Sequence, residues 1–251
     1  MTAPTSRVPP LRAAPPAFHG AGMTHRGRVR ERNEDSILTD PSGVLWAIAD
    51  GMGGYGNGDV AADIVIDFLS RLPDDVLAAP ALRERLEQAN ATVRRRALEE
   101  GRVGMGATVV ALMIQNAVAN IAWAGDCRAY LMRRGSLRLL THDHTVVQDL
   151  VDQGLLAPEQ RREHPEGNVV TRAVGGEDGI EVETLGVPLV GGDRILMCSD
   201  GLTACLGDHE IAARMEGAGS PEGMCSALVQ DALEAGAPDN VSVIVIFADE
   251  A

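Results

Sequence analysis

Short apolar runs dominate the body of the chain, and many of them are apolar at consecutive positions rather than at alternating ones. Runs of about four to eight such residues, bounded by Gly, Asn, Asp or Pro, are typical of strands buried on both faces. They predict strands at residues 44–49, 107–114, 117–124, 128–133, 180–187, 194–198 and 241–247. Short turn sequences join the runs between residues 107 and 133, which predicts an antiparallel meander there.

Two longer segments follow a helical period instead. Apolar residues have helical spacing at residues 59–72 and 82–100, and further helices are predicted at 145–153, 208–215 and 221–234. The second segment holds a cluster of arginines, but the glutamates between them favour a solvated helix face over a nucleic-acid surface. Residues 154–176 are polar and contain prolines, which predicts an irregular excursion of the kind that often forms a binding loop.

The N-terminal residues 1–22 are rich in Pro and Ala and lack the apolar core of a secretory signal. They predict a flexible tail ahead of one large domain at residues 23–251, since 45% hydrophobic content can fill a sizeable core. No apolar run approaches the roughly 20 residues that cross a bilayer, so no membrane partner is expected. The cysteines show no paired CxxC spacing and are interpreted as reduced, buried thiols. We therefore expect a free-standing cytoplasmic monomer.

The chain is strongly acidic, and its basic residues are all of one kind. The formal net charge of −14 at pH 7 argues against nucleic acid as a partner, because a phosphate backbone requires a basic surface. All 22 basic residues are arginines, since the sequence contains no lysine. Chemistry that needs an amine nucleophile or a P-loop lysine is thereby excluded. Any recognition of phosphate must use arginine.

Acidic residues stand at the border between an apolar strand and a turn in four places. Asp35 and Asp239 each precede an apolar run, whereas Asp50 and Asp200 each follow one. Asp50 is the most informative, because the glycines after it allow a sharp turn and leave the carbonyl of Gly51 open as a second oxygen ligand. Taken singly, each place is better explained as an ordinary turn. Together they offer the oxygen ligands of a hard divalent cation, which indicates a metal-dependent enzyme.

In this order, the four motifs resemble the type 2C (PPM) family of metal-dependent serine/threonine protein phosphatases. The resemblance covers residues 23–247, and the bacterial branch fits best because DGMGG at residues 50–54 has its form. Further matching segments are GMGAT at 104–108, GDCR at 125–128, LTHDH at 140–144 and TRAVG at 171–175. The resemblance implies an α+β fold in which helices flank a central antiparallel β-sandwich on both sides (α-β-β-α), with a flap subdomain at about residues 145–176.

The resemblance also implies the ligands of two Mn²⁺ or Mg²⁺ ions at one end of the sandwich. Asp50 bridges the ions, the carbonyl of Gly51 binds one of them, and Asp200 and Asp239 complete the protein ligands of that ion. Two cations of this kind offset the negative charge of a phosphate ester and convert water into a nucleophile at neutral pH. Asp50, Asp200 and Asp239 are therefore the expected catalytic residues.

Three more residues surround the ions in the pattern that the resemblance implies. Asp35 belongs to the metal site and, together with Glu34, orients the waters that complete the second ion. Arg30 matches the phosphate-binding arginine of the family, and its planar fork suits two phosphoryl oxygens. An ordinary surface arginine beside Glu31 is the alternative interpretation of Arg30.

Two departures from the family pattern leave roles open. Many relatives have, in place of Met52, a histidine that is thought to protonate the leaving group. The general acid is therefore unassigned, with a metal-bound water as the first candidate and His144 or another histidine as the second. Asp126 matches a ligand of a third ion, which we expect to be weak because the position that is acidic in some relatives is Ala204. The alternative for Asp126 is a turn residue paired with Arg128.

The expected function is hydrolysis of phosphoserine and phosphothreonine in proteins by a water activated between two divalent cations. Its partners would be phosphoproteins and the bacterial serine/threonine kinase that it opposes. The alternative is a catalytically silent, phosphoprotein-binding regulator of the same fold, which the loss of a metal-binding aspartate would favour, and none is lost. A phosphatase dedicated to an anti-sigma-factor antagonist or to a secretion system shares the chemistry and differs in its partner. The sequence does not distinguish these settings or the metal used in the cell.

Overall fold

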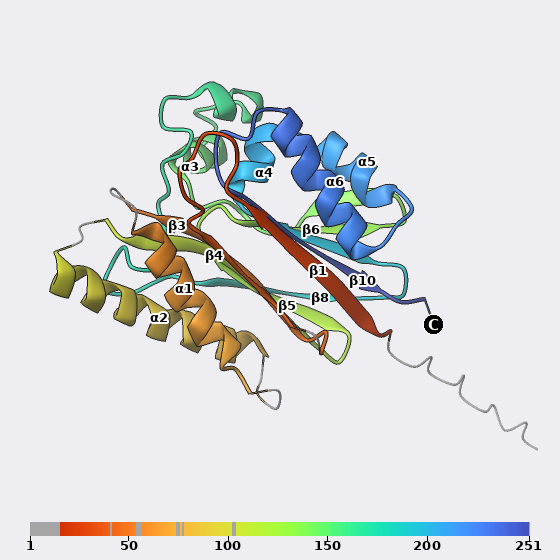
Figure 1. Ribbon diagram of the computed structural model, residues 1–251, viewed down its shortest axis with the longest axis horizontal. Helices are drawn as coiled ribbons and strands as arrows, with labels where there is room; N and C mark the ends of the chain where they lie inside the picture. Colours follow the sequence, from red (N-terminus) through yellow and green to blue (C-terminus); the bar gives the residue numbers. More distant parts are fainter. Residues whose placement is uncertain are drawn as a thin grey trace, which may run out of the picture.

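The computed structural model describes residues 16–250, except for residues 41, 54–56, 74, 75, 77, 102 and 103. Within these residues the chain forms two five-stranded antiparallel sheets that pack face to face, with helices on both outer faces (Figure 1). The predicted α-β-β-α arrangement is confirmed. No helix in the described ranges combines the length and the apolar character that a membrane span requires.

One sheet brings together strands from both ends of the chain, whereas the other follows the sequence order for four of its five strands. The first has the order β1 (Phe18–His25), β10 (Val241–Ala248), β9 (Arg194–Cys198), β6 (Arg128–Arg133) and β7 (Ser136–Leu139). The second has the order β2 (Asp35–Thr39), β3 (Leu45–Met52), β4 (Gly106–Gln115), β5 (Val118–Ala124) and β8 (Glu183–Pro188). Every neighbouring pair in both sheets is antiparallel.

Helices cover the outer face of each sheet, and the apolar core has three clusters. One cluster lies between the two sheets, and the other two lie between each sheet and its helices. The sheet of β3 and β4 is covered by α1 (Gly58–Ser70) and α2 (Ala78–Glu100). The other sheet is covered by α4 (Asp200–Cys205), α5 (Asp208–Glu216) and α6 (Pro221–Glu234). The flap contains α3 (Val146–Asp152) and the short 3₁₀ helix η1 (Pro158–Glu163).

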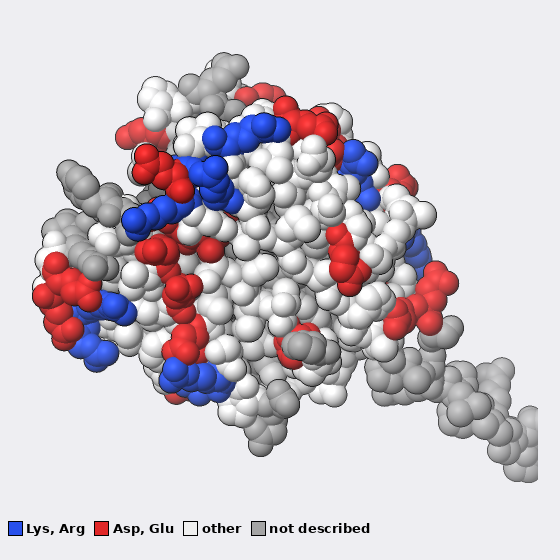
Figure 2. All heavy atoms as spheres, viewed as in Figure 1, with Lys and Arg blue, Asp and Glu red and all other residues white. Residues whose placement is uncertain are grey.

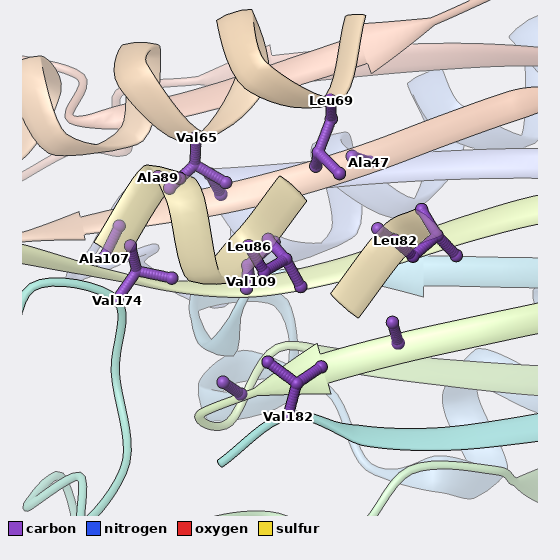
Figure 3. Packing of buried hydrophobic residues seen from close by; sticks show 14 of the residues in the cluster. Ala47, Val65, Leu69, Leu82, Leu86, Ala89, Ala107, Val109, Val174 and Val182 are labelled. Atoms are coloured by element: carbon purple, nitrogen blue, oxygen red, sulfur yellow. The ribbon is translucent and has the colours of Figure 1, made fainter. Parts of the chain in front are cut away.

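Each sheet packs against the other sheet with one face and against helices with the other, which explains why the strands are apolar at consecutive positions. In β4, Val110 and Leu112 face the cluster between the sheets, whereas Val109 and Ala111 face the helices. Side chains alternate between the two faces of a strand, so a strand buried on both faces must be apolar throughout. Figure 3 shows the helix-side cluster, in which Val109 lies among leucines and alanines of α2.

The predicted meander is wrong in its third strand. β4 and β5 pair as expected, but β6 crosses to the other sheet and pairs with β7 and β9. The outer edge of β5 is already occupied by β8, so β6 has no edge to join there. Gly125, with a φ of +112°, begins the short connection that leads the chain across the sandwich.

The boundary predicted for the N-terminal tail is also wrong. The strand β1 begins at Phe18 and pairs with β10 along its whole length, so residues 18–22 belong to the sandwich. Gly20 and Gly22 concealed this strand, because glycine is uncommon in strands. Both are close to the opposite sheet: a Cβ on Gly22 would lie 2.7 Å from the Cγ2 atom of Thr39. Residues 1–15, the rest of the predicted tail, lie outside the described part of the chain.

Candidate metal centre

The four motif aspartates leave the two sheets at the same end of the sandwich. Asp35 and Asp50 are direct cross-strand partners in β2 and β3. β9 ends shortly before Asp200, and β10 begins shortly after Asp239, and these two strands are antiparallel neighbours. The first residues of one strand and the last residues of its antiparallel partner must share an edge. Asp50 accordingly lies within the electrostatic influence of the other three.

Asp35 is the most deeply placed of these carboxylates, and one of its oxygens lacks a partner. Its Oδ2 atom accepts hydrogen bonds from the hydroxyls of Ser199 at 3.0 Å and Ser242 at 2.6 Å. Its Oδ1 atom is buried and has no hydrogen-bond partner among the residues that the structure describes. Burial raises the pKa of Asp35 to about 7, against the opposing effect of the two hydroxyls. A buried, unpaired carboxylate oxygen requires a compensating proton, water or cation.

Asp50 and Asp200 add further negative charge beside Asp35. Burial, followed by the charges of Asp35 and Asp200, raises the pKa of Asp50 well above its ordinary value. The pKa of Asp200 is also raised, by burial first and then by Asp239, although a hydrogen bond with Asp50 lowers it. Like charges that crowd together favour a bound cation, and an all-oxygen donor set suits Mg²⁺ or Mn²⁺.

The side chains alone do not make a complete set of ligands. In the described part of the chain, no group of three or more His, Cys, Asp or Glu side chains has an arrangement that could hold a metal ion by itself. The predicted site relies on a bridging carboxylate, a backbone carbonyl and waters. The donor chemistry and the unpaired oxygen of Asp35 fit a hard cation, and the roles assigned to individual residues stay predictions.

Gly51 is held by close packing that no other residue would permit. Its N–H group donates to the carbonyl of Glu34 at 3.1 Å. A Cβ on Gly51 would lie 2.2 Å from the carbonyl oxygen of Gly58, at the start of α1. The Glu34 carboxylate accepts a hydrogen bond from the N–H of Gly58 at 3.3 Å. The start of β2, the end of β3 and the start of α1 are thus joined beside Asp50.

Arg30 lies at the exposed rim of the carboxylate cluster. Its Nη2 atom is 2.7 Å from the Oδ2 atom of Asp239. The hydrogen bond and charge of Asp239 raise the pKa of Arg30, and Asp200 and Glu34 raise it further. Arg30 is exposed, as the alternative interpretation of a surface arginine expects, but its described ion pair is with Asp239 and not with Glu31. Arg30 is therefore placed where an anion bound at the cluster would meet a guanidinium group.

Asp126 lies beside Asp200, in the connection between β5 and β6. Burial raises its pKa to about 7, with further contributions from Asp200 and Asp143. Arg128 forms a two-pronged pair with Asp143, at 2.9 Å from Nε to Oδ1 and 2.5 Å from Nη2 to Oδ2. The alternative that Asp126 serves as the partner of Arg128 is therefore not what the hydrogen bonds show. A third ion at Asp126 stays a prediction.

A cavity of about 810 Å³ extends from Asp126 and Asp200 to the flap. It is bounded by α4, which contributes Ala204, and by η1 and the residues that follow it. The isolated backbone pair of Ala107 with Val174 attaches the flap to β4, and a second isolated pair, Thr145 with Val170, joins the two ends of the flap. The cleft beside the carboxylates thus has one wall from the sandwich side and one from the flap.

His144 is engaged by the protein on both of its ring nitrogens. Its Nδ1 atom accepts a hydrogen bond from the N–H of Gly125 at 3.0 Å, and its Nε2 atom lies 3.1 Å from the Oε1 atom of Glu183. The ring is buried and stacks on Trp123. Burial lowers the pKa of His144, which favours the neutral ring. His144 therefore holds the loop of Asp126 in place and is poorly arranged to act as a general acid.

Asn240 is a site residue whose importance sequence reasoning missed. Its Nδ2 atom donates to the carbonyls of Arg26 and Arg32, each at 2.9 Å, and its Oδ1 atom accepts from the N–H of Glu34 at 2.8 Å. It therefore fixes the segment that carries Arg30 to the residue after Asp239. In the sequence, the Asp-Asn pair indicated only a turn, and no local signal marks contacts with residues more than 200 positions away.

Comparisons with known proteins agree with this geometry. A family model described as Protein phosphatase 2C matches residues 22–150. The serine/threonine protein phosphatase PstP of Mycobacterium tuberculosis is 37% identical over 231 residues, which are 90% of this chain and 44% of that protein. The chain thus spans less than half the length of this relative.

Solved structures are similar over almost the whole chain. PppA, described as a key regulatory component of the type VI secretion system in Pseudomonas aeruginosa, is 37% identical with a TM-score of 0.85, covering 93% of this chain and 99% of PppA. The catalytic domain of PstP, solved with two manganese ions, is 33% identical with a TM-score of 0.83, covering 93% of this chain and 99% of that domain. This chain belongs to the protein phosphatase 2C family.

Proposed function

We propose that this chain removes phosphate from phosphoserine and phosphothreonine residues of proteins, with two Mn²⁺ or Mg²⁺ ions as cofactors. The observation that carries the proposal is the convergence of Asp35, Asp50, Asp200 and Asp239 at one end of the sandwich, with Arg30 at its rim. When bound, divalent cations stabilise the charge of the transferred phosphoryl group and lower the pKa of water. The manganese ions in the related PstP domain support this choice of cofactor.

The residues of the chain have separate tasks in this proposal. Asp50, Asp200 and Asp239 hold the cations, together with the carbonyl of Gly51. Asp35, which is fixed by two serine hydroxyls, directs its unpaired oxygen to the waters around them. Glu34 takes part in the same water network from the start of β2.

Arg30 performs the recognition step. Its guanidinium group, already 2.7 Å from Asp239, orients the phosphoryl oxygens of the substrate at the cluster. A planar fork of N–H donors fixes both the position and the rotation of a phosphate, which a point charge cannot do. In the proposed reaction the phosphoryl group is transferred to water, and the leaving group is the side-chain oxygen of Ser or Thr.

The biological partner is proposed at a coarser level. We infer a bacterial serine/threonine kinase and its substrates as partners, with the chain acting as a cytoplasmic monomer. The similarity to PppA favours a secretion-system setting as a second candidate, but the identity to PstP is 33% to 37%, against 37% to PppA, and this small difference does not choose between them. A catalytically silent regulator is not favoured, because the relatives are named phosphatases and all four aspartates are present.

A metal-dependence assay tests the proposal. Release of phosphate from para-nitrophenyl phosphate and from a phosphothreonine peptide would be measured with Mn²⁺, with Mg²⁺ and with a chelator, for the wild type and Asp200→Asn. We expect the chelator to abolish turnover. The substitution should lower it by roughly 100-fold or more, since even outer-shell changes at metal sites cost about 10- to 100-fold.

The matched control is Asp67→Asn, which removes one carboxylate from the exposed surface of α1, where Asp67 pairs with Arg71. It should retain wild-type turnover. Absence of metal-dependent turnover in every arm would refute the enzyme proposal and leave the silent regulator. Equal turnover in Asp200→Asn and wild type would refute the assigned ligand.

A further inference from the structure

A basic loop stands beside the carboxylate cluster of this acidic chain. Residues 26–32 connect β1 and β2, and we call them the arginine loop. The loop holds four arginines and one glutamate, although the chain as a whole has a net charge of −14. Figure 2 shows blue side chains gathered at the upper left, where Figure 1 draws this loop above β3 and beside α4. Its arginines, all exposed, are Arg26, Arg28, Arg30 and Arg32.

The arginine loop is fixed to the rest of the site. The side chain of Asn240 binds carbonyls at both of its ends. The N–H of Arg28 donates to the carbonyl of Ala237 at 2.9 Å. Gly27 adopts a φ of +76° and fits so closely that a Cβ would lie 2.1 Å from the carbonyl oxygen of Asp239. The backbone of the arginine loop is therefore held in one position beside the cluster.

Two of the arginines have structural partners that explain them. Arg30 pairs with Asp239 at the rim of the cluster. The Nε atom of Arg28 donates to the carbonyl of Leu233 at 2.6 Å, in the last turn of α6. A cation at that end of a helix also interacts favourably with the helix dipole. These contacts account for the presence of both arginines.

The other two arginines lack a carboxylate partner. One N–H group of Arg26 donates to the carbonyl of Arg30 at 3.3 Å, which brings its guanidinium group next to the phosphate-binding position. Within the described ranges, neither Arg26 nor Arg32 forms an ion pair. Several other arginines do, each with an Asp of this chain. Each guanidinium group carries five N–H donors, so most of these donors face solvent.

We propose that Arg26 and Arg32 bind a second anionic group of the substrate, a carboxylate or a phosphate close to the phosphorylated residue. The inference rests on the proposed function and narrows its substrate class to acidic or multiply phosphorylated segments. Arg30 holds the phosphate that is removed, and its two neighbours in the arginine loop hold the flanking charge. Guanidinium groups bind carboxylate and phosphate through the same pair of donors, so both sources share one chemistry.

The opposite side of the cluster has the reverse charge. The cavity under the flap is lined by five carboxylates and two arginines, of which Arg128 is paired with Asp143 and Arg161 donates to the side chain of Gln148, so its lining is acidic on balance. An acidic flank would be repelled there and attracted to the arginine loop. The charge distribution around the site therefore favours one placement of an acidic segment, with its anionic flank over residues 26–32.

Peptide kinetics test the inference. Three phosphothreonine peptides would be compared, with flanking glutamines, with flanking glutamates and with flanking non-hydrolysable phosphonates. The proteins are the wild type, Arg26→Gln/Arg32→Gln and the matched control Arg83→Gln/Arg95→Gln. The control changes the net charge by the same amount at exposed positions of α2, which covers the outer face of the β3–β4 sheet.

The wild type and the control should prefer at least one anionic peptide over the glutamine peptide by about three- to tenfold in kcat/KM, as expected for two exposed ion pairs. The preference should come from a lower KM for the anionic peptide. It should decrease at high salt, because exposed charges are screened. In Arg26→Gln/Arg32→Gln the ratio should fall to about one. A preference for both anionic peptides indicates shared recognition, whereas a preference for the phosphonate alone identifies a second phosphate as the ligand.

Either of two results overturns the inference: equal kcat/KM for all three peptides in the wild type, or the same preference in the arginine-loop variant as in the control. Hydrolysis of para-nitrophenyl phosphate with Mn²⁺ separates this failure from a failure of the proposed function. If the wild type hydrolyses that small phosphate without any peptide preference, only the inference about Arg26 and Arg32 is refuted. If it hydrolyses nothing, the proposed function is refuted.

Discussion

A single buried amide, that of Asn240, organises the side of the carboxylate cluster that carries Arg30. In the described part of the chain, the side-chain hydrogen bonds of Asn240 go to main-chain groups and not to a candidate cation ligand. It satisfies two carbonyls of the arginine loop and the N–H of Glu34. A side chain of another type could not supply two donors and one acceptor in this geometry. Asn240 thus positions Arg30 through the main chain on either side of it.

Replacing Asn240 with Ala should therefore affect substrate binding as well as stability. The change leaves buried polar groups unpaired, which we expect to lower the free energy of unfolding by about 2 kcal/mol. It should also raise KM for para-nitrophenyl phosphate, because the segment that carries Arg30 loses its attachment. Urea unfolding and steady-state kinetics on the same preparation measure the two effects.

Asn90→Ala is the control for this prediction. Asn90 is equally buried, binds the carbonyl of Glu177 and the N–H of Gly175, and lies in α2. It should lose comparable stability with KM unchanged. If both variants raise KM by the same factor, the positioning role of Asn240 is refuted.

At the level of single residues, the sequence predicted the ends of strands well and their long-range contacts poorly. Asp35 and Asp50 could be placed at strand borders because apolar runs and turn dipeptides are local signals. The pairing of Arg128 with Asp143, rather than with Asp126, depends on how two loops meet in space. No local pattern records such a contact, and the same holds for the contacts of His144 and Asn240.

Among the elements, β1 contributes most beyond what its sequence indicates. It is the edge strand of its sheet and pairs with β10 over eight residues. Phe18 packs against the core between the sheets, and Ala21 against the cluster beneath α6. Its two glycines lowered its strand propensity, so a pattern-based reading assigned most of it to the tail. Tertiary packing against β10 and the opposite sheet outweighs that local preference.

Two truncations measure this contribution. Deleting residues 1–22 should destabilise the protein by about 3 kcal/mol or more relative to deleting residues 1–15, since each lost ladder hydrogen bond costs about 1 kcal/mol and apolar contacts are lost as well. Thermal and urea unfolding of both forms measure the difference in the free energy of unfolding. This difference is the contribution of residues 16–22. Equal stability of the two forms would show that the start of β1 is dispensable.

The elements that the pattern missed or misplaced share a physical cause. β7 is short and mostly exposed, so it has no apolar run to reveal it. The helix α4 begins at Asp200, where the Asp-Gly pair indicated a turn. β6 was recognised as a strand, but its sheet was not, because the choice between two sheets depends on which edges are free. Local signals determine that a strand exists, and global packing determines its neighbours.

At the scale of the whole molecule, ionisation of the crowded, buried carboxylates lowers the stability of the metal-free fold. Bound cations would offset this repulsion. Burial raises the pKa values of Asp35 and Asp126 to about 7 from an ordinary value of 3.8, and those of Asp50 and Asp200 are also raised. The folded, metal-free protein therefore binds protons more tightly than the unfolded chain between about pH 4 and pH 7. Unfolding releases those protons, so stability must fall as pH rises through that window.

We expect the metal-free protein to lose stability by roughly 1.4 kcal/mol per pH unit for each such proton, between about pH 4 and pH 7. Urea unfolding in chelator across that range measures the slope, and Asp126→Asn should reduce it while Asp67→Asn should not. Excess Mn²⁺ should restore stability above about pH 7, since a ligand that binds only the folded state stabilises it. The carboxylates are then ionised and free to bind, so metal protection should grow with pH. A slope unchanged by Mn²⁺ would mean that the cluster binds no cation, whatever its likeness to related sites.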